Sequence, residues 1–181
     1  MVRKSKEGQA GFTTENAFVQ ASNYWDRGQL TKAFDIFLRL ADQGDASSQV
    51  NVGYFFDRGL GVRRDQAKAL LWYRRAYRHG HASGAHNIGT LYRDRGNFAV
   101  AAKWFSRALH SGNDGSALEL AKIHLRGRNP KSAVTFLRRV AGSSHVTGAE
   151  QEEAVKLLGD LGRAQDRRTS VSRRRNTGGL N

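Results

Sequence analysis

A short pattern of small and bulky apolar residues recurs along the chain at nearly constant spacing. In each copy a small residue is followed three and four positions later by two bulky apolar residues, and a further apolar residue stands seven positions after the start. The copies begin at Ala33, Ala69, Ala101 and Ala133, which are 36, 32 and 32 residues apart. Apolar residues at these intervals lie along one face of an α-helix. A period of this length is typical of stacked helical repeats, in which each repeat buries its apolar face only against its neighbours.

A second set of small and apolar residues predicts a partner helix before each of these helices. Its members share a small residue at the point where the two helices of a pair would cross: Gly53, Gly89 and Ala121. Glycine inside a helix costs about 1 kcal/mol of helix stability, so close packing is the reason to keep it there. Ala17, Ala21 and Tyr24 give the same pattern upstream. We therefore expect an all-α fold of helix–turn–helix pairs.

Residues that begin and end helices support this reading. Glycines that would end a helix in a left-handed conformation occupy one place in three copies: Gly44, Gly80 and Gly112. Asp45 and Asp114 precede the first helices of two copies, where a carboxylate can accept a hydrogen bond from a free backbone N–H. Asn129 precedes Pro130, and proline is favoured at the first position of a helix.

The repeat marks divide the chain into four units and a final helix. The units cover residues 14–45, 46–81, 82–113 and 114–147, and a capping helix is expected over 148–162. Residues 1–13 are expected to form a flexible basic segment. Residues 163–181 are rich in Arg and lack apolar periodicity, so we expect them to be disordered.

The second unit carries a longer turn with a distinctive signature. Around this turn the sequence holds a Gly-x-Gly-Val turn, an Asp, a Lys-Ala pair and a Trp-Tyr pair: Gly59, Gly61, Val62, Asp65, Lys68, Ala69, Trp72 and Tyr73. This segment resembles the Sel1-like repeat signature, and the shorter units resemble tetratricopeptide repeats. The resemblance implies a right-handed α-solenoid of about four repeats whose first helices line a concave surface. Both families are associated with scaffolding of protein complexes, and neither implies an enzymatic activity.

Polar residues of the predicted first helices are the candidates for partner binding. In the families that this chain resembles, an Asn at the place of Asn51 and Asn87 lies on the concave face. An amide both donates and accepts a hydrogen bond, which suits the backbone of a bound peptide. The candidate residues are Asn51, Tyr54, Arg58, His86, Asn87, Thr90, Arg93, Lys122 and Arg126. The alternative is that these are solvated polar positions without a ligand.

The chain is strongly basic, with a formal net charge of +14. Six Arg and one Asp place +5 of this charge on residues 163–181. A second basic run lies around the second unit: Arg58, Arg63, Arg64, Lys68, Arg74, Arg75 and Arg78. Such a run is usually a solvated helix face, but it also attracts acidic partners. Together with the Arg-rich tail it makes nucleic-acid binding the competing prediction.

No pattern in the sequence predicts a catalytic, metal or cofactor site. The absence of Cys excludes disulfides and thiolate chemistry. His79, His81 and His86 have no Cys or carboxylate nearby in the sequence to complete a ligand set, so no metal is predicted. The aromatic residues with helical spacing are interpreted as core: Phe37, Trp72, Tyr73, Trp104, Phe105 and Phe136.

These observations predict a non-enzymatic interaction module, without cofactors, that binds an acidic or extended protein partner through the concave face. A bacterial immunity-type or effector-associated role is a further alternative, which rests on analogy with Sel1-like proteins. No signal peptide is recognised, and no apolar run approaches the roughly 18 residues of a spanning helix. We therefore expect a cytoplasmic protein without membrane insertion.

Overall fold

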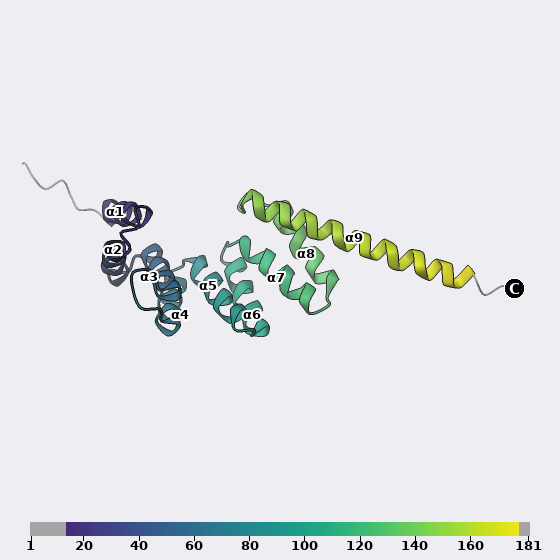
Figure 1. Cartoon of the computed structure of the whole chain (residues 1–181), viewed down its shortest axis with the longest axis horizontal. Helices are drawn as coiled ribbons and strands as arrows, with labels where there is room; N and C mark the ends of the chain where they lie inside the picture. The colour runs from purple at the N-terminus through teal and green to yellow at the C-terminus, as the bar shows by residue number, and fades with distance from the viewer. Residues whose placement is uncertain (1–13, 178–181) are drawn as a thin grey trace, which may run out of the picture. The chain divides into compact units, whose positions relative to one another are not determined.

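The computed structural model describes residues 14–177 as nine α-helices, with no strand among these residues. The helices are α1 (Thr14–Asp26), α2 (Leu30–Asp42), α3 (Ala46–Arg58), α4 (Gln66–Arg78), α5 (Ala82–Asp94), α6 (Phe98–His110), α7 (Gly115–Arg126), α8 (Pro130–Ala141) and α9 (Gly148–Thr177) (Figure 1). One helix pair lies within each of the four repeat units, and the expected all-α repeat fold is confirmed. The predicted flexible segment 1–13 lies outside the described residues.

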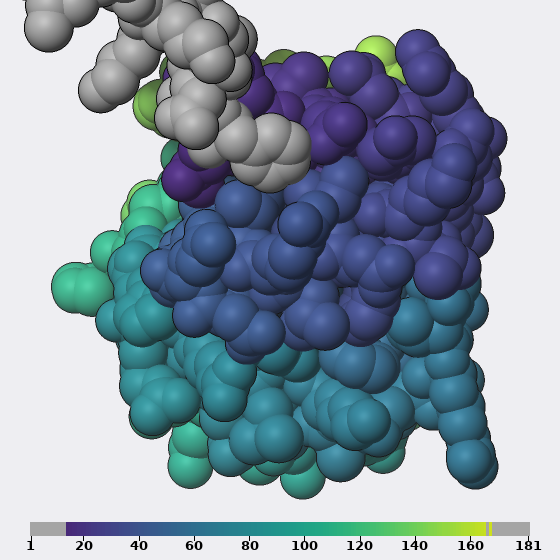
Figure 2. Space-filling view, turned by 90° about the vertical axis from the view of Figure 1, so that its left-hand side faces the viewer, coloured from purple at the N-terminus to yellow at the C-terminus, as the bar shows by residue number. Residues whose placement is uncertain are grey.

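The first compact unit, Met1–Leu91, has an aromatic core. Phe37 of α2 and Phe55 of α3 are fully buried. Trp25 of α1 packs edge-on against Phe55, with 4.8 Å between the ring centroids. Helices α1, α2, α3 and α4 pack in chain order, and Figure 2 shows the side chains of α1 and α2 (purple) lying directly on those of α3 and α4 (blue).

The second compact unit, Tyr92–Asn181, is built in the same way. Phe105 of α6 is fully buried beside Leu120 of α7. Leu137 of α8 is buried against Ala154 of α9. Because α9 packs on both α8 and α7, it covers the apolar side of the last pair. The capping helix expected from the sequence is therefore present.

The aromatic residues assigned to the core differ in burial. Phe37, Tyr73 and Phe105 are buried, whereas Trp72, Trp104 and Phe136 are half-buried. The guanidinium groups of Arg75 and Arg107 each lie 4.5 Å from the ring centroid of the tryptophan three positions earlier. These two tryptophans therefore stand at the edge of the core, with one ring face covered by Arg.

Helix α9 continues to Thr177, well beyond the end at residue 162 expected from the sequence. Residues 163–176 contain no Gly or Pro to interrupt a helix, and Arg, Gln and Ala favour helical backbone. The lack of apolar periodicity removes tertiary packing from this segment but not its helical preference. Helix thus replaces the disorder expected for residues 163–177, and residues 178–181 lie outside the described part of the chain.

The helix ends agree with the predicted residues at all but one position. Gly44, Gly80 and Gly112 have φ of 99°, 85° and 93°, the left-handed conformation expected of them. The Asp45 carboxylate accepts a hydrogen bond from the Ser48 backbone N–H at 2.6 Å. Asn129 does the same for Ser132 at 3.2 Å, with Pro130 at the first helical position.

The predicted N-cap Asp114 is wrong by one residue. Asp114 has helical backbone angles and makes no capping hydrogen bond. The side chain of Asn113 accepts instead, from the Ser116 N–H at 3.1 Å. The Asp114 carboxylate accepts hydrogen bonds from Arg139 Nη2 at 2.8 Å and from Ser143 Oγ at 2.7 Å. Asp114 therefore joins the start of α7 to the end of α8.

These bonds make the Asp114 link sensitive to acid. The hydrogen bond from Arg139, then that from Ser143, lowers the pKa of Asp114 below its ordinary value of 3.8. Stability from this group is thus fully present above the ordinary pKa and is lost as the pH falls through the lower pKa of the folded state. Asp114→Asn should cost about 1 kcal/mol near pH 7 and progressively less as the pH falls below 3.8, measured by urea unfolding. The exposed Asp35→Asn is the matched control, and an equal pH dependence of both variants would contradict this role.

Candidate functional site

The candidate binding residues of the first compact unit lie on the first helices of two successive pairs. We call these positions the amide face: Asn51, Tyr54 and Arg58 on α3, and His86, Asn87 and Thr90 on α5. All are half-buried except Arg58, which is exposed. They therefore combine a fixed position in a packed helix with access from outside.

Tyr54 and Arg58 belong to a stack of rings and charge. The Tyr54 ring stacks on Trp25 of α1, with 5.7 Å between centroids and 28° between planes. The Arg58 guanidinium lies 5.6 Å from the Tyr54 ring centroid, and its Nε is 3.8 Å from the Asp57 carboxylate. Trp25 was missing from the candidates because its own helix pair lacks the Asn marker. The stack holds a positive charge on α3, seven residues after Asn51.

Asn51 and Asn87 hold equivalent places, 36 residues apart, in successive first helices. Neither side-chain amide is hydrogen-bonded to any side chain or backbone group that the structure describes. Each amide retains one acceptor and two donor positions. A half-buried amide without a partner gains most from a ligand that both donates and accepts, as a peptide backbone does.

The candidate residues of the second compact unit, Tyr92–Asn181, interact with other side chains of the protein. Arg93 at the end of α5 pairs with Glu119 of α7 and with Asp94. The Lys122 ammonium lies 3.6 Å from Glu119 and 3.0 Å from Glu153 of α9. The Arg126 guanidinium lies 4.3 Å from the ring centroid of Phe98. These three cations therefore hold neighbouring helices together.

Glu119 organises this network, although it is not among the binding residues predicted from the sequence. It stands 32 residues after Asn87, at the same place of the next first helix, and that spacing alone could have identified it. Its side chain is 14% exposed. Burial acts to lower the pKa of Arg93, but the hydrogen bonds to Glu119 and Asp94 outweigh it and raise that pKa. Arg93 thus stays charged and paired.

Part of the basic run of the second repeat, residues 46–81, is engaged within the protein. Arg63, Arg64 and Lys68 border a pocket of about 480 Å³ at the start of α4. Arg64 Nε donates to the Asp57 carbonyl oxygen at 2.8 Å, which fixes the long turn. Lys68 lies 5.2 Å from the Phe56 ring centroid. Part of the positive charge therefore serves the turn itself.

The described residues show neither a metal centre nor a membrane-spanning helix. No three His, Asp or Glu side chains of the described part are grouped closely enough to hold a metal ion. No helix within residues 14–177 is long and apolar enough to cross a membrane.

Comparison with known proteins identifies the second and third repeats. The Sel1 repeat model matches residues 46–81 and 83–113, the second and third helix pairs. A relative from Arabidopsis thaliana, ERAD-associated E3 ubiquitin-protein ligase component HRD3B, is 30% identical over 114 residues. The match covers 60% of this chain and 18% of that relative. The chain therefore spans less than a fifth of that protein's length.

Two solved structures share the fold. The Sel1 repeat protein from Oxalobacter formigenes has a TM-score of 0.65 at 24% identity, over 82% of this chain and 61% of that one. A protective antigen of uropathogenic Escherichia coli strains, displaying an SLR fold, has a TM-score of 0.63 at 25% identity. This second match covers 70% of this chain and 30% of the antigen.

Proposed function

Because this chain belongs to the Sel1-like repeat family, we propose that it is a non-enzymatic interaction module that binds an extended protein segment through the amide face. Proteins with Sel1 repeats generally serve as interaction scaffolds. The observation that carries the proposal is the recurrence of two half-buried amides without internal partners, Asn51 and Asn87, on successive first helices. The cytoplasmic location expected from the sequence stays a prediction.

The chemistry of the amide face favours a peptide backbone over an isolated ion. Asn51 and Asn87 can each receive an N–H and donate to a carbonyl oxygen, so an extended segment can satisfy both in turn. Arg58, held against the Tyr54 ring, adds a positive charge that favours acidic residues in that segment. Arg93, Lys122 and Arg126 are paired internally. We therefore assign them the maintenance of helix positions rather than first contact with the partner.

The double variant Asn51→Ala/Asn87→Ala should keep its melting temperature and lose about tenfold or more in partner affinity. Surface polar substitutions usually change stability by no more than about 0.5 kcal/mol, whereas removing one partner of a desolvated hydrogen bond costs about 1–3 kcal/mol. The partner is first captured from host extract with and without nuclease, and its affinity is then measured by calorimetry. Asn23→Ala, at an exposed position of α1, is the matched control.

Two results would count against this proposal. A destabilised double variant with unchanged affinity would make the two amides packing elements. A complex that disappears with nuclease, and whose affinity falls steeply with salt, would favour nucleic acid through the basic run and the Arg-rich segment.

A further inference from the structure

Gln49 is a buried polar residue where the other repeats have alanine. The equivalent places of the other first helices hold Ala17, Ala85 and Ala117, each at most 1% exposed. Gln49 is 2% exposed. Its Nε2 donates to the Ala41 carbonyl oxygen at 3.0 Å. Because a carbonyl oxygen only accepts, this bond fixes the orientation of the amide and leaves Oε1 as a free acceptor.

The Gln49 Oε1 has no hydrogen-bond partner among the described residues. A buried acceptor left without a donor costs free energy, and such groups are uncommon in folded proteins. The bond to Ala41 explains why the amide nitrogen is kept. It does not explain the oxygen, which an alanine at this place would avoid altogether.

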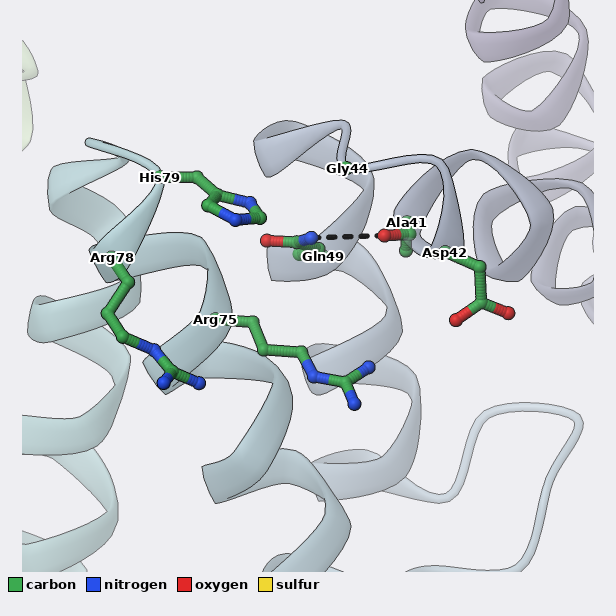
Figure 3. Close-up of a pocket in the computed structure, with 7 residues that line it drawn as sticks. All are labelled: Ala41, Asp42, Gly44, Gln49, Arg75, Arg78 and His79. Carbon is green, nitrogen blue, oxygen red and sulfur yellow. Dashed lines mark hydrogen bonds between the residues drawn. The ribbon is translucent and has the colours of Figure 1, made fainter.

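Gln49 borders a pocket of about 560 Å³ between the ends of α2 and α4 and the start of α3. Figure 3 shows Oε1 turned away from Ala41 toward the His79 side of the pocket, while the side chains of Arg75 and Arg78 extend below Gln49 in this view. The Asp42 carboxylate points to the opposite side of the same view. The pocket is thus bordered by two arginines and by the residue that carries the buried acceptor.

The two arginines are available to an anion. Arg75 and Arg78 are both exposed, and no carboxylate of the described residues pairs with either of them. Arg75 is held 4.5 Å from the Trp72 ring centroid, so its direction is fixed in advance. Cations are also favourable at the C-terminal end of a helix such as α4. That preference accounts for the arginines alone but not for the buried acceptor beside them.

We propose that this pocket binds an aspartate of a partner segment, whose side-chain carboxylate accepts from Arg75 and Arg78 and whose own backbone N–H donates to Gln49 Oε1. Guanidinium–carboxylate pairs are among the stronger hydrogen bonds in proteins. An aspartate carries its carboxylate one methylene group from the backbone, so donor and acceptor arrive together. The inference rests on the proposed function in that the ligand is a protein segment, but it uses different residues from the amide face.

Three peptides test this assignment on the full chain. Acetyl-Ala-Asp-Ala-amide should produce saturable NMR shifts of the Gln49 side-chain NH₂ and of the Arg75 and Arg78 Nε–H signals. Acetyl-Ala-Asn-Ala-amide has the same shape without the charge and should bind about tenfold more weakly or worse. Acetyl-Ala-Ala-Ala with a free C-terminus presents a terminal carboxylate instead of a side-chain carboxylate. It should also bind more weakly than the Asp peptide.

Three variants locate the site. Gln49→Ala, which copies the other repeats, should fold and lose about tenfold in affinity for the Asp peptide. Arg78→Gln should lose at least as much. Arg74→Gln changes an exposed arginine of α4 that does not border the pocket, and it should bind as the parent does.

The possible outcomes separate this inference from the proposed function. Equal binding of the Asp and Asn peptides, or unchanged binding by Gln49→Ala, would overturn it. Stronger binding of the terminal carboxylate would overturn the choice of an aspartate. Asn51→Ala/Asn87→Ala should leave these peptide shifts intact, so failure of the amide face and failure of this pocket give different results.

Discussion

Replacing Phe105 with Ala should lower the free energy of unfolding of the second compact unit by about 3–5 kcal/mol. The ring is fully buried. It packs in one cluster with Ala101 and Leu120, and the partly buried Phe136 packs against this cluster. Truncation removes the apolar contacts and leaves a cavity that helices held at fixed spacing cannot close. Urea unfolding followed by circular dichroism measures the loss.

The neighbouring Trp104 provides the control for this prediction. The two residues are adjacent in the apolar stripe, but Trp104 is half-buried, with Arg107 over its ring. Trp104→Ala should therefore cost less, about 1–2 kcal/mol, because much of the lost area already faces solvent. Equal losses for the two variants would contradict the difference in burial.

These two residues mark what the repeat pattern can and cannot predict. Helical spacing places both on the core side of α6, and it also yields the helix pairs and their approximate bounds. Spacing carries no information on how far each ring is covered, because coverage depends on the neighbouring helix. The cap at α7 is a related case: Asn113 and Asp114 are both good N-cap residues, and only the observed backbone decides between them.

The position of the candidate site was predictable from the sequence, but the ion pairs that some of its residues form were not. The spacing of Asn51 and Asn87 marks the amide face without any structure. The engagement of Arg93 and Lys122 by Glu119 depends on which helices lie side by side. Gln49 has the same limitation, since a glutamine in a helical pattern is ordinarily assigned to the solvent side. Its burial becomes evident only once α2 and α4 are in place.

Gly84→Ala should cost about 2–3 kcal/mol in the first unit, although alanine is the better helix former. A Cβ at this position would lie 2.5 Å from the Tyr73 carbonyl oxygen and 2.7 Å from the Tyr77 backbone nitrogen. Both atoms belong to the backbone of α4, so no side-chain rotation can relieve the contact. Helix α5 would have to move away from α4.

The same substitution at Gly162 of α9 separates this contact from intrinsic helix preference. No atom lies within 4 Å of a Cβ built there, so Gly162→Ala should stabilise the protein by up to about 1 kcal/mol. Displacement of α5 would also shift Asn87 relative to Asn51, and on our proposal partner affinity should fall in Gly84→Ala at temperatures where the protein is still folded. An unchanged unfolding midpoint for Gly84→Ala would mean that α4 and α5 do not approach so closely, and it would contradict the spacing of the two amides described above.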